Sequence, residues 1–161
     1  MKKILLFILF PILLAFCKSG SSTVSKREVR REAKYVVNNL IKTATDNIGI
    51  RYKAAGTTKN GYDCSGLVYS TFESEGIKLP RASYDQSKIG RLIKFDDARK
   101  GDLIFFKTNN SKQINHVGLI TEINREEIKF IHSSTSKGVI VSSTNETYYK
   151  KSFVQINRII E

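Results

Sequence analysis

Cysteine and histidine, the residue types best suited to nucleophilic and acid–base chemistry, are rare in this chain. Its 161 residues include two cysteines, Cys17 and Cys64, and two histidines, His116 and His132. Cys64 follows Asp63 at the start of a segment whose apolar residues recur at helical spacing, which places the thiol in the first turn of a helix. The free N–H groups of such a turn stabilise a thiolate, so they lower the thiol pKa and make Cys64 a candidate nucleophile.

The two histidines are predicted to meet at one edge of an antiparallel hairpin. Alternating residues predict strands near 117–123 and 128–132, with His116 opening the first and His132 ending the second. Side chains alternate between the two faces of a sheet. The two histidines therefore share a face only if the residue numbers of the two partners in each cross-strand pair add up to an even value. A loop of three or five residues at 124–127, or a bulge, meets that condition, whereas a two-residue turn does not. On a shared face, His116 would accept the proton of the thiol and His132 would orient His116.

The elements that must hold these residues come in the order helices, then strands. Helices are expected behind a capping box at Ser25, over 64–75, and at about 84–89 behind a second capping box that begins at Ser83. Strands follow, joined by turns so short that neighbours must run antiparallel. They lie near 102–107, 117–123, 128–132, 139–142 and 153–159. The fold class is therefore α+β, with N-terminal helices, including the one that carries Cys64, packed on an antiparallel sheet of about five strands.

The first residues of the chain are interpreted as an export signal. A basic start precedes an apolar run at 4–16, which is too short to span a bilayer comfortably, and Cys17 follows it. Residues 14–17 resemble a bacterial lipoprotein box, in which the cysteine is lipidated and becomes the new N-terminus. Phe16 stands where that box usually has a small residue, so an ordinary secretory signal is the alternative. Lipidation of Cys17 would leave Cys64 as the only thiol of the exported domain.

The chain therefore divides into a lipoprotein-type signal peptide at 1–17, a flexible tether rich in Ser and Gly at 18–24, and one domain at 25–161. The formal net charge is +12, or +10 without Lys2 and Lys3, which predicts attraction to polyanions. An exported protein meets little nucleic acid, so anionic phospholipid heads and anionic wall polymers are the expected partners, with a solvated surface that binds nothing specific as the alternative. The first helix carries a basic face beside its apolar stripe, and a packed helix with a solvated face is preferred to one that lies on a membrane.

Taken together, the motifs resemble those of the NlpC-type cell-wall cysteine peptidases, which are papain-like enzymes of bacteria. The matching segments follow one another in the family's order: Tyr52, Gly61 to Val68 around Asp63-Cys64-Ser65-Gly66, Gly76 to Ser83, Gly101 to Phe106, His116 to Leu119 and Ile131 to Ser133. The resemblance implies hydrolysis of peptidoglycan stem peptides, often between γ-D-glutamate and a diamino acid, in cell-wall remodelling. Two departures are Ala55, where a second glycine is usual, and Lys100, where proline is frequent. Neither touches a group that transfers protons.

The resemblance also assigns roles to individual residues. By motif position, Cys64 is the nucleophile, His116 the general base and acid, and His132 the third polar member, which orients His116. Three further positions stand where the family contacts substrate or lines the cleft: Tyr52, Asp63 and Ser83. No cofactor and no nucleic-acid partner are implied. The protein is expected to be a monomer in the cell envelope that acts on stem peptides and is held on a membrane by its lipid anchor.

Three other functions remain open at this point. Cys64, His116 and His132 are residue types that bind zinc, although no fourth ligand is evident from the spacing. The domain could instead be a non-catalytic module that binds the cell wall, in which case Cys64→Ala would leave its function in cells intact. It could also be an amidase or transacylase that uses the same thiol chemistry on another substrate.

Overall fold

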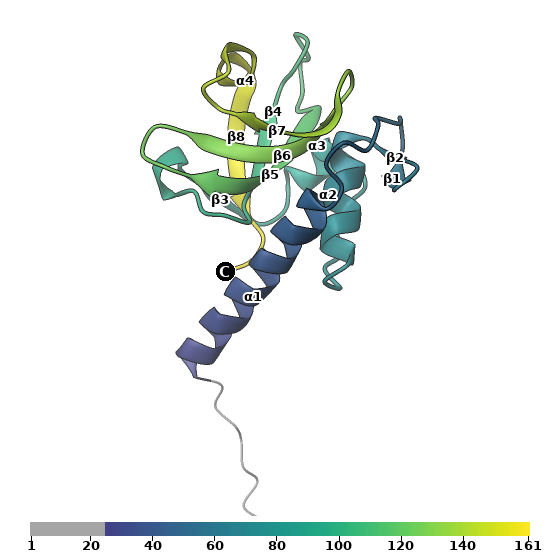
Figure 1. The fold of residues 1–161 in the computed structure, drawn as a ribbon. Coiled ribbons are helices and arrows are strands. Elements are labelled where there is room, and N and C mark those ends of the chain that lie inside the picture. Colours follow the sequence, from purple (N-terminus) through teal and green to yellow (C-terminus); the bar gives the residue numbers. More distant parts are fainter. Residues whose placement is uncertain (1–24) are drawn as a thin grey trace, which may run out of the picture.

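Helices fill the N-terminal part of the described chain and strands fill most of the C-terminal part (Figure 1). The computed structural model describes residues 25–161, so the expected signal peptide, Cys17 and the tether lie outside the described residues. The helices are α1 (Lys26–Thr45), α2 (Cys64–Glu73), α3 (Ser83–Gln86) and α4 (Thr147–Ser152), with a 3-10 turn at Phe95–Asp97. The strands are β1 (Thr57–Thr58), β2 (Gly61–Tyr62), β3 (Arg91–Ile93), β4 (Leu103–Phe106), β5 (His116–Ile123), β6 (Ile128–Ser134), β7 (Gly138–Ser143) and β8 (Phe153–Arg158). None of the helices between residues 25 and 161 combines the length and the apolar character that crossing a bilayer requires.

Six of the strands form one antiparallel sheet in the order β3-β8-β4-β5-β6-β7, and β1 pairs with β2 in a separate hairpin. This arrangement confirms the α+β class and the packing of the Cys64 helix that the sequence predicts. The sheet has one strand more than expected, because β3 is a three-residue edge strand that pairs only with β8. Helix α4 is also additional, since it lies between the last two strands that the sequence predicts.

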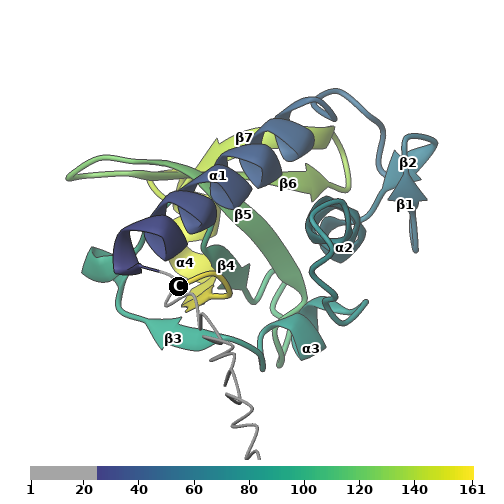
Figure 2. The ribbon, with the colours of Figure 1, turned by 90° about the horizontal axis from the view of Figure 1, so that it is seen from below.

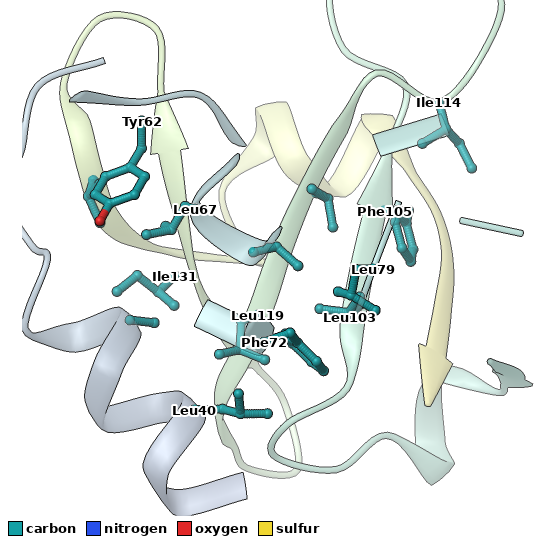
Figure 3. Close-up of a cluster of buried hydrophobic side chains, with 14 residues drawn as sticks. Leu40, Tyr62, Leu67, Phe72, Leu79, Leu103, Phe105, Ile114, Leu119 and Ile131 are labelled. Atoms are coloured by element: carbon teal, nitrogen blue, oxygen red, sulfur yellow. The ribbon is translucent and has the colours of Figure 1, made fainter. Parts of the chain in front are cut away.

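The sheet separates two hydrophobic clusters, because its side chains alternate between the two faces. On one face, α1 and α2 cover the strands (Figure 2), and residues such as Leu40 and Phe72 pack against them in the cluster drawn in Figure 3. On the other face, Ile104 and Phe106 pack with Tyr149 of α4. Strand β4 contributes to both clusters, so all four of its residues are buried. This buried strand and its neighbour β5 form the rigid support of the site described below.

A buried ion pair joins the start of β4 to the end of β8. Arg158 donates from Nε and Nη2 to the two carboxylate oxygens of Asp102, each at 2.8 Å, and both side chains are almost completely buried. Asp102 also accepts the backbone N–H of Arg99 at 2.7 Å, and Arg158 donates to the carbonyl oxygen of Asp97 at 2.9 Å. Buried charges are tolerated when they are paired and hydrogen-bonded in this way.

The third helix does not have the capping box expected at Ser83. Helix α3 begins at Ser83 itself, its N-cap is Ala82, and no side chain caps it. It is held instead by Gln86, whose Nε2 donates to the carbonyl oxygens of Ser65 at 3.1 Å and Pro80 at 2.8 Å. Contact between the last residue of α3 and the first turn of α2 therefore fixes the position of this helix, which no side-chain cap does.

Candidate active site

Cys64 is the first residue of α2, as the sequence predicts. Asp63 caps this helix, because its backbone is extended and its Oδ1 accepts the N–H of Gly66 at 2.7 Å. Glycine is required at position 66, since a Cβ there would collide with the carbonyl oxygen of Gly56 in the preceding loop. The first turn of α2 is therefore locked against that loop. It presents the partly exposed thiol 3.8 Å from the carbonyl oxygen of Asn115, directly before β5.

Strands β5 and β6 bring the two histidines into contact, with Nε2 of His116 2.9 Å from Nδ1 of His132. The two histidines lie on the same face of the sheet because β5 contains a bulge, one of the two solutions that the sequence allows. Next to the turn, the numbers of paired residues add up to an odd value. A register shift between Ile120 and Glu122 makes the sum even from there to the site. Without this bulge the two imidazoles would lie on opposite faces of the sheet.

Tyr149 continues the hydrogen-bonded chain beyond His132. Its hydroxyl lies 3.2 Å from Nε2 of His132, whose side chain is fully buried. Because Nε2 of His116 is engaged with His132, Nδ1 is the ring nitrogen of His116 that is left for the Cys64 thiol. It can accept a proton only if Nε2 carries the hydrogen, which is then donated to His132. His132 must in turn carry its own hydrogen at Nε2 and donate it to Tyr149.

A polar group on the other side of the thiol consists of Asp63, Ser65 and Arg81. Arg81 binds both carboxylate oxygens of Asp63, at 2.6 and 3.0 Å, and donates to Oγ of Ser65 at 2.9 Å. Of these three residues, only Asp63 is a site candidate from the sequence. The available signal for Ser65 and Arg81 is that both lie inside the motifs that resemble the family. No sequence signal identifies Tyr149, because its contact depends on a helix that the pattern does not predict.

Two other residues selected from the sequence differ in their relation to the thiol. Tyr52 is half-buried. The pKa of its phenol is raised mainly by burial and next by the charge of Cys64, so the phenol lies close to the thiol. Ser83 is buried at the start of α3, so it is better placed to support the wall of the cleft than to contact substrate. The zinc alternative requires at least three His, Cys, Asp or Glu side chains arranged to hold a metal ion. Residues 25–161 contain no such group.

Comparison with known proteins places this site in a family. The model of the NlpC/P60 family matches residues 49–158, which include all of the side chains just described. The chain belongs to the NlpC/P60 family. It is 36% identical over 148 residues to an Escherichia coli K12 protein named murein DD-endopeptidase MepS/murein LD-carboxypeptidase, with 88% of this chain and 76% of that protein covered. It is 34% identical over 129 residues to the gamma-D-glutamyl-L-lysine dipeptidyl-peptidase of Bacillus subtilis 168, with 79% and 42% covered.

A solved structure supports the same assignment for the fold. An NlpC/P60 family protein from Bacillus cereus ATCC 10987 matches this chain with a TM-score of 0.69 and 31% identity, over 78% of this chain and 40% of that one. The family resemblance and the fold inferred from the sequence are therefore confirmed. This NlpC/P60 chain is a cysteine peptidase of a class that includes cell-wall endopeptidases.

Burial controls protonation in the site of this NlpC/P60 peptidase. It lowers the pKa of His116 to about 4 and, together with the charge of His116, lowers the pKa of His132 to about 3. It raises the pKa of the Cys64 thiol, and the negative charge of Asp63 raises it further, against backbone hydrogen bonds that lower it. The direction is opposite to the one expected from a helix N-terminus alone, because desolvation of the thiolate outweighs the N–H groups of the first turn. The free enzyme therefore holds a neutral thiol beside neutral imidazoles.

The buried neutral histidines make stability depend on pH. Their pKa values in the folded protein lie below the ordinary 6.5, so the unfolded chain binds more protons than the folded one as the pH falls below 6.5. The contribution of these histidines to the free energy of unfolding is expected to be fully present above pH 6.5. The free energy of unfolding should fall by about 3 kcal/mol or more as the pH approaches 4. Urea titrations across this range measure the effect. In the double variant His116→Gln/His132→Gln, the free energy of unfolding should lose most of its dependence on pH. An unchanged dependence would mean that the two histidines do not cause it.

Tyr149→Phe is expected to lower kcat about tenfold with little change in KM. The variant leaves the N–H of buried His132 without an acceptor, which costs roughly 1–3 kcal/mol and favours the tautomer in which His116 cannot accept the thiol proton. Steady-state kinetics measure the effect, with Tyr35→Phe as the control. Tyr35 is 66% exposed on α1, and it does not line the cavity beside His116. Equal kcat values for the two variants would rule out this role of Tyr149.

A cavity of about 290 Å³ opens beside His116. It lies between the β4–β5 loop, the β6–β7 turn and α4, and Cys64 is not among the residues that line it. Hydroxyl groups make up much of its wall, and the two charged side chains are Lys137 and Glu146. The cavity therefore offers both a positive and a negative group to whatever part of a substrate lies next to His116.

Proposed function

We propose that this chain is an exported cysteine endopeptidase that hydrolyses peptidoglycan stem peptides through Cys64, His116 and His132. The observation that carries the proposal is the contact between Nε2 of His116 and Nδ1 of His132, which leaves one nitrogen of His116 for the thiol at the start of α2. Family membership supports the reaction class. The names of the two relatives, a murein endopeptidase and a γ-D-glutamyl-lysine peptidase, support the substrate class.

In this mechanism Cys64 is the nucleophile and His116 is first base and then acid. As sulfur attacks the scissile carbonyl carbon, the thiol proton passes to Nδ1 of His116. Backbone N–H groups at the start of α2 stabilise the oxyanion. The C–N bond then breaks, and His116 gives its proton to the leaving amine. Water attacks the thioester with His116 as base, the carboxylate product leaves, and the proton returns to sulfur.

His132 acts through His116 and does not touch the reacting atoms. It accepts the Nε2 hydrogen of His116 and so keeps the lone pair of His116 at Nδ1, where it can accept the thiol proton. Burial lowers the pKa of His132, and its Nε2 lies within hydrogen-bond distance of the Tyr149 hydroxyl, so His132 serves as a neutral acceptor while His116 becomes charged. The proton gained from the thiol therefore stays on His116, where the leaving amine needs it.

The proposed scissile bond joins γ-D-glutamate to a diamino acid. A γ-linked glutamate keeps a free α-carboxylate. The cation near the thiol is Arg81, whose side chain is 37% exposed and which shares its charge with Asp63, so the carboxylate would share Arg81 with Asp63. The leaving amine takes its proton from His116, so the diamino acid would lie in the cavity beside His116. Lys137 and Glu146 in that cavity match the carboxyl and amino groups of a diamino acid.

Defined peptides test the choice of bond. One substrate is L-Ala-γ-D-Glu-diaminopimelate-D-Ala. The other carries a DD cross-link, the class of bond in the name of the Escherichia coli relative. Products are separated by chromatography and identified by mass. The γ-D-glutamyl bond is expected to be cleaved with a kcat/KM at least about tenfold higher. Faster cleavage of the cross-link would replace this proposal with a DD-endopeptidase.

The proposed location is the cell envelope, with a signal peptide at 1–17, a lipid on Cys17, a tether at 18–24 and the catalytic domain at 25–161. The basic start, the apolar run and the lipoprotein-like residues before Cys17 support this organisation. Metabolic labelling with an alkyne fatty acid tests it. Label is expected in the membrane fraction of the wild type and absent from Cys17→Ser. Unlabelled wild type would leave an ordinary secretory signal as the better reading of the N-terminus.

A further inference from the structure

A groove of about 470 Å³ lies at the opposite end of β4 from the active site. Strand β4 begins directly after Gly101 and Asp102, which line the groove, and ends at Phe106, which pairs with His116. The groove runs between α1 and the segment that precedes β4, with the last residues of the chain as a third side. In Figure 1, α1 and the C-terminus lie next to each other at the end of the molecule away from α4.

Five cationic residues line this groove, and one of them, Arg158, is paired with Asp102. The other four come two from α1 and two from the segment before β4. They are Arg30, Lys34, Arg99 and Lys100, and together they define what we call the basic groove. All four residues are exposed. Lys26 continues the row along α1, because Lys26, Arg30 and Lys34 are spaced by four residues and share one side of the helix.

The acidic side chains of the basic groove are already neutralised by arginines. Asp102 is bound at two positions by Arg158, each at 2.8 Å, and Glu161 is bound by Arg91 at 2.8 and 2.9 Å. The four cations that define the groove, in contrast, form no ion pair within residues 25–161. Residues 1–24 contain no Asp or Glu that could supply one. The groove therefore presents a cluster of uncompensated positive charge to its surroundings.

The position of the basic groove in the chain indicates what it meets. Residues 25–32 of α1 are all exposed, so this end of the helix is not covered by the rest of the described chain. Only residues 18–24 separate it from Cys17, and a segment of that length spans at most about 25 Å when fully extended. With a lipid on Cys17, the row of cations along α1 is held close to the membrane surface. Anionic headgroups strengthen the binding of a basic segment roughly fivefold for each Lys or Arg near that surface.

We propose that the basic groove docks on the phosphate groups of anionic phospholipids in the membrane that holds Cys17. This inference rests on the lipid anchor proposed above. Ala33, Val37 and Ile160 line the groove beside the cations and add apolar contact to the docked surface. Because the groove and His116 lie at opposite ends of β4, docking turns the catalytic cleft away from the membrane and toward the cell wall.

Vesicle binding by the chain without its lipid tests the proposal. Residues 25–161 contain both hydrophobic clusters, so a chain that begins at Lys18 keeps the whole described fold. It is sedimented with vesicles of pure phosphatidylcholine, or with vesicles in which roughly a third of the lipid is anionic phosphatidylglycerol, which attracts basic segments. Binding to the anionic vesicles only is expected. The variant Arg30→Gln/Lys34→Gln/Arg99→Gln/Lys100→Gln should bind them roughly 600-fold more weakly, because each of the four charges contributes about fivefold.

The control removes the same charge elsewhere, with Lys53, Lys59, Lys78 and Lys112 all changed to Gln. These residues are exposed and form no ion pair in the described chain. The control should keep most of the binding, and equal losses in both variants would reduce the effect to net charge and overturn the proposal. Unchanged vesicle binding by the groove variant, with loss of its retention on isolated cell wall, would instead assign the groove to a wall polymer. Both variants should cleave soluble stem peptides like the wild type, so a missing peptidase activity would count against the proposed function and not against docking.

Discussion

Replacement of Cys64 by alanine is expected to reduce hydrolysis of stem peptides by at least about a thousandfold. The reaction requires a group that forms and then releases an acyl intermediate. In the proposed mechanism this group is the Cys64 sulfur, which lies at the start of α2 and next to the carbonyl oxygen of Asn115. Backbone N–H groups and substrate contacts remain in the variant, and they sustain only a small residual rate. Cleavage of the tetrapeptide by Cys64→Ala and wild type, at equal protein concentration, measures the difference.

The fold should survive this substitution, so the loss can be assigned to chemistry. The thiol makes one weak contact, at 3.8 Å to the carbonyl oxygen of Asn115, and it is only partly buried. The free energy of unfolding of Cys64→Ala should stay within about 1 kcal/mol of the wild type. Cys64→Ser keeps the shape of the side chain but replaces the thiol with a weaker nucleophile. It should also hydrolyse stem peptides at least about a hundredfold more slowly than the wild type. A rate for Cys64→Ala within tenfold of the wild type would remove Cys64 from the mechanism.

Asp102→Ala is expected to cause the largest loss of stability, about 3–5 kcal/mol. The variant leaves Arg158 as a buried charge without its carboxylate, and Arg158 is only 4% exposed at the junction of β4 and β8. It also removes the acceptor of the Arg99 N–H. Urea unfolding at pH 7 measures the change. Activity per folded molecule should be retained, because Asp102 lies at the end of β4 away from His116.

The exposed pair between Arg91 and Glu161 is the control for Asp102. Its geometry is equally good, with distances of 2.8 and 2.9 Å, but both side chains are more than half exposed. Glu161→Ala should therefore cost less than about 1 kcal/mol, because exposed ion pairs contribute little. Equal losses in the two variants would mean that burial does not decide the strength of these pairs.

Local signals explain which parts of this structure can be predicted from the sequence. The N-cap Asp63, the helical spacing behind it and the loop before it place Cys64 correctly at the start of a helix. The alternation in β5 and β6 gives both strands and puts the two histidines at one end of the hairpin. Whether they share a face cannot be read from alternation alone. That choice rests on the bulge beside Thr121, a residue type that suits either face of a strand.

The features that the sequence does not predict depend on contacts between distant segments. Strand β3 exists because three residues pair with β8, more than sixty positions later. Helix α4 has no side-chain cap to mark its start, so Tyr149 cannot be connected to His132 in advance. The thiol pKa is predicted in the wrong direction for a similar reason, because the helix start is a local feature and burial is a property of the whole fold.

The most direct test of the central claim is digestion of purified peptidoglycan by the chain from Ser25 onward, with Cys64→Ala in parallel and the products read by mass spectrometry. The wild type is expected to release fragments with new carboxyl ends at γ-D-glutamate and new amino ends at the diamino acid, and the variant is expected to release none. The claim is contradicted if the variant releases the same fragments. It is also contradicted if neither protein releases fragments although both bind the wall, since the domain would then be a binding module.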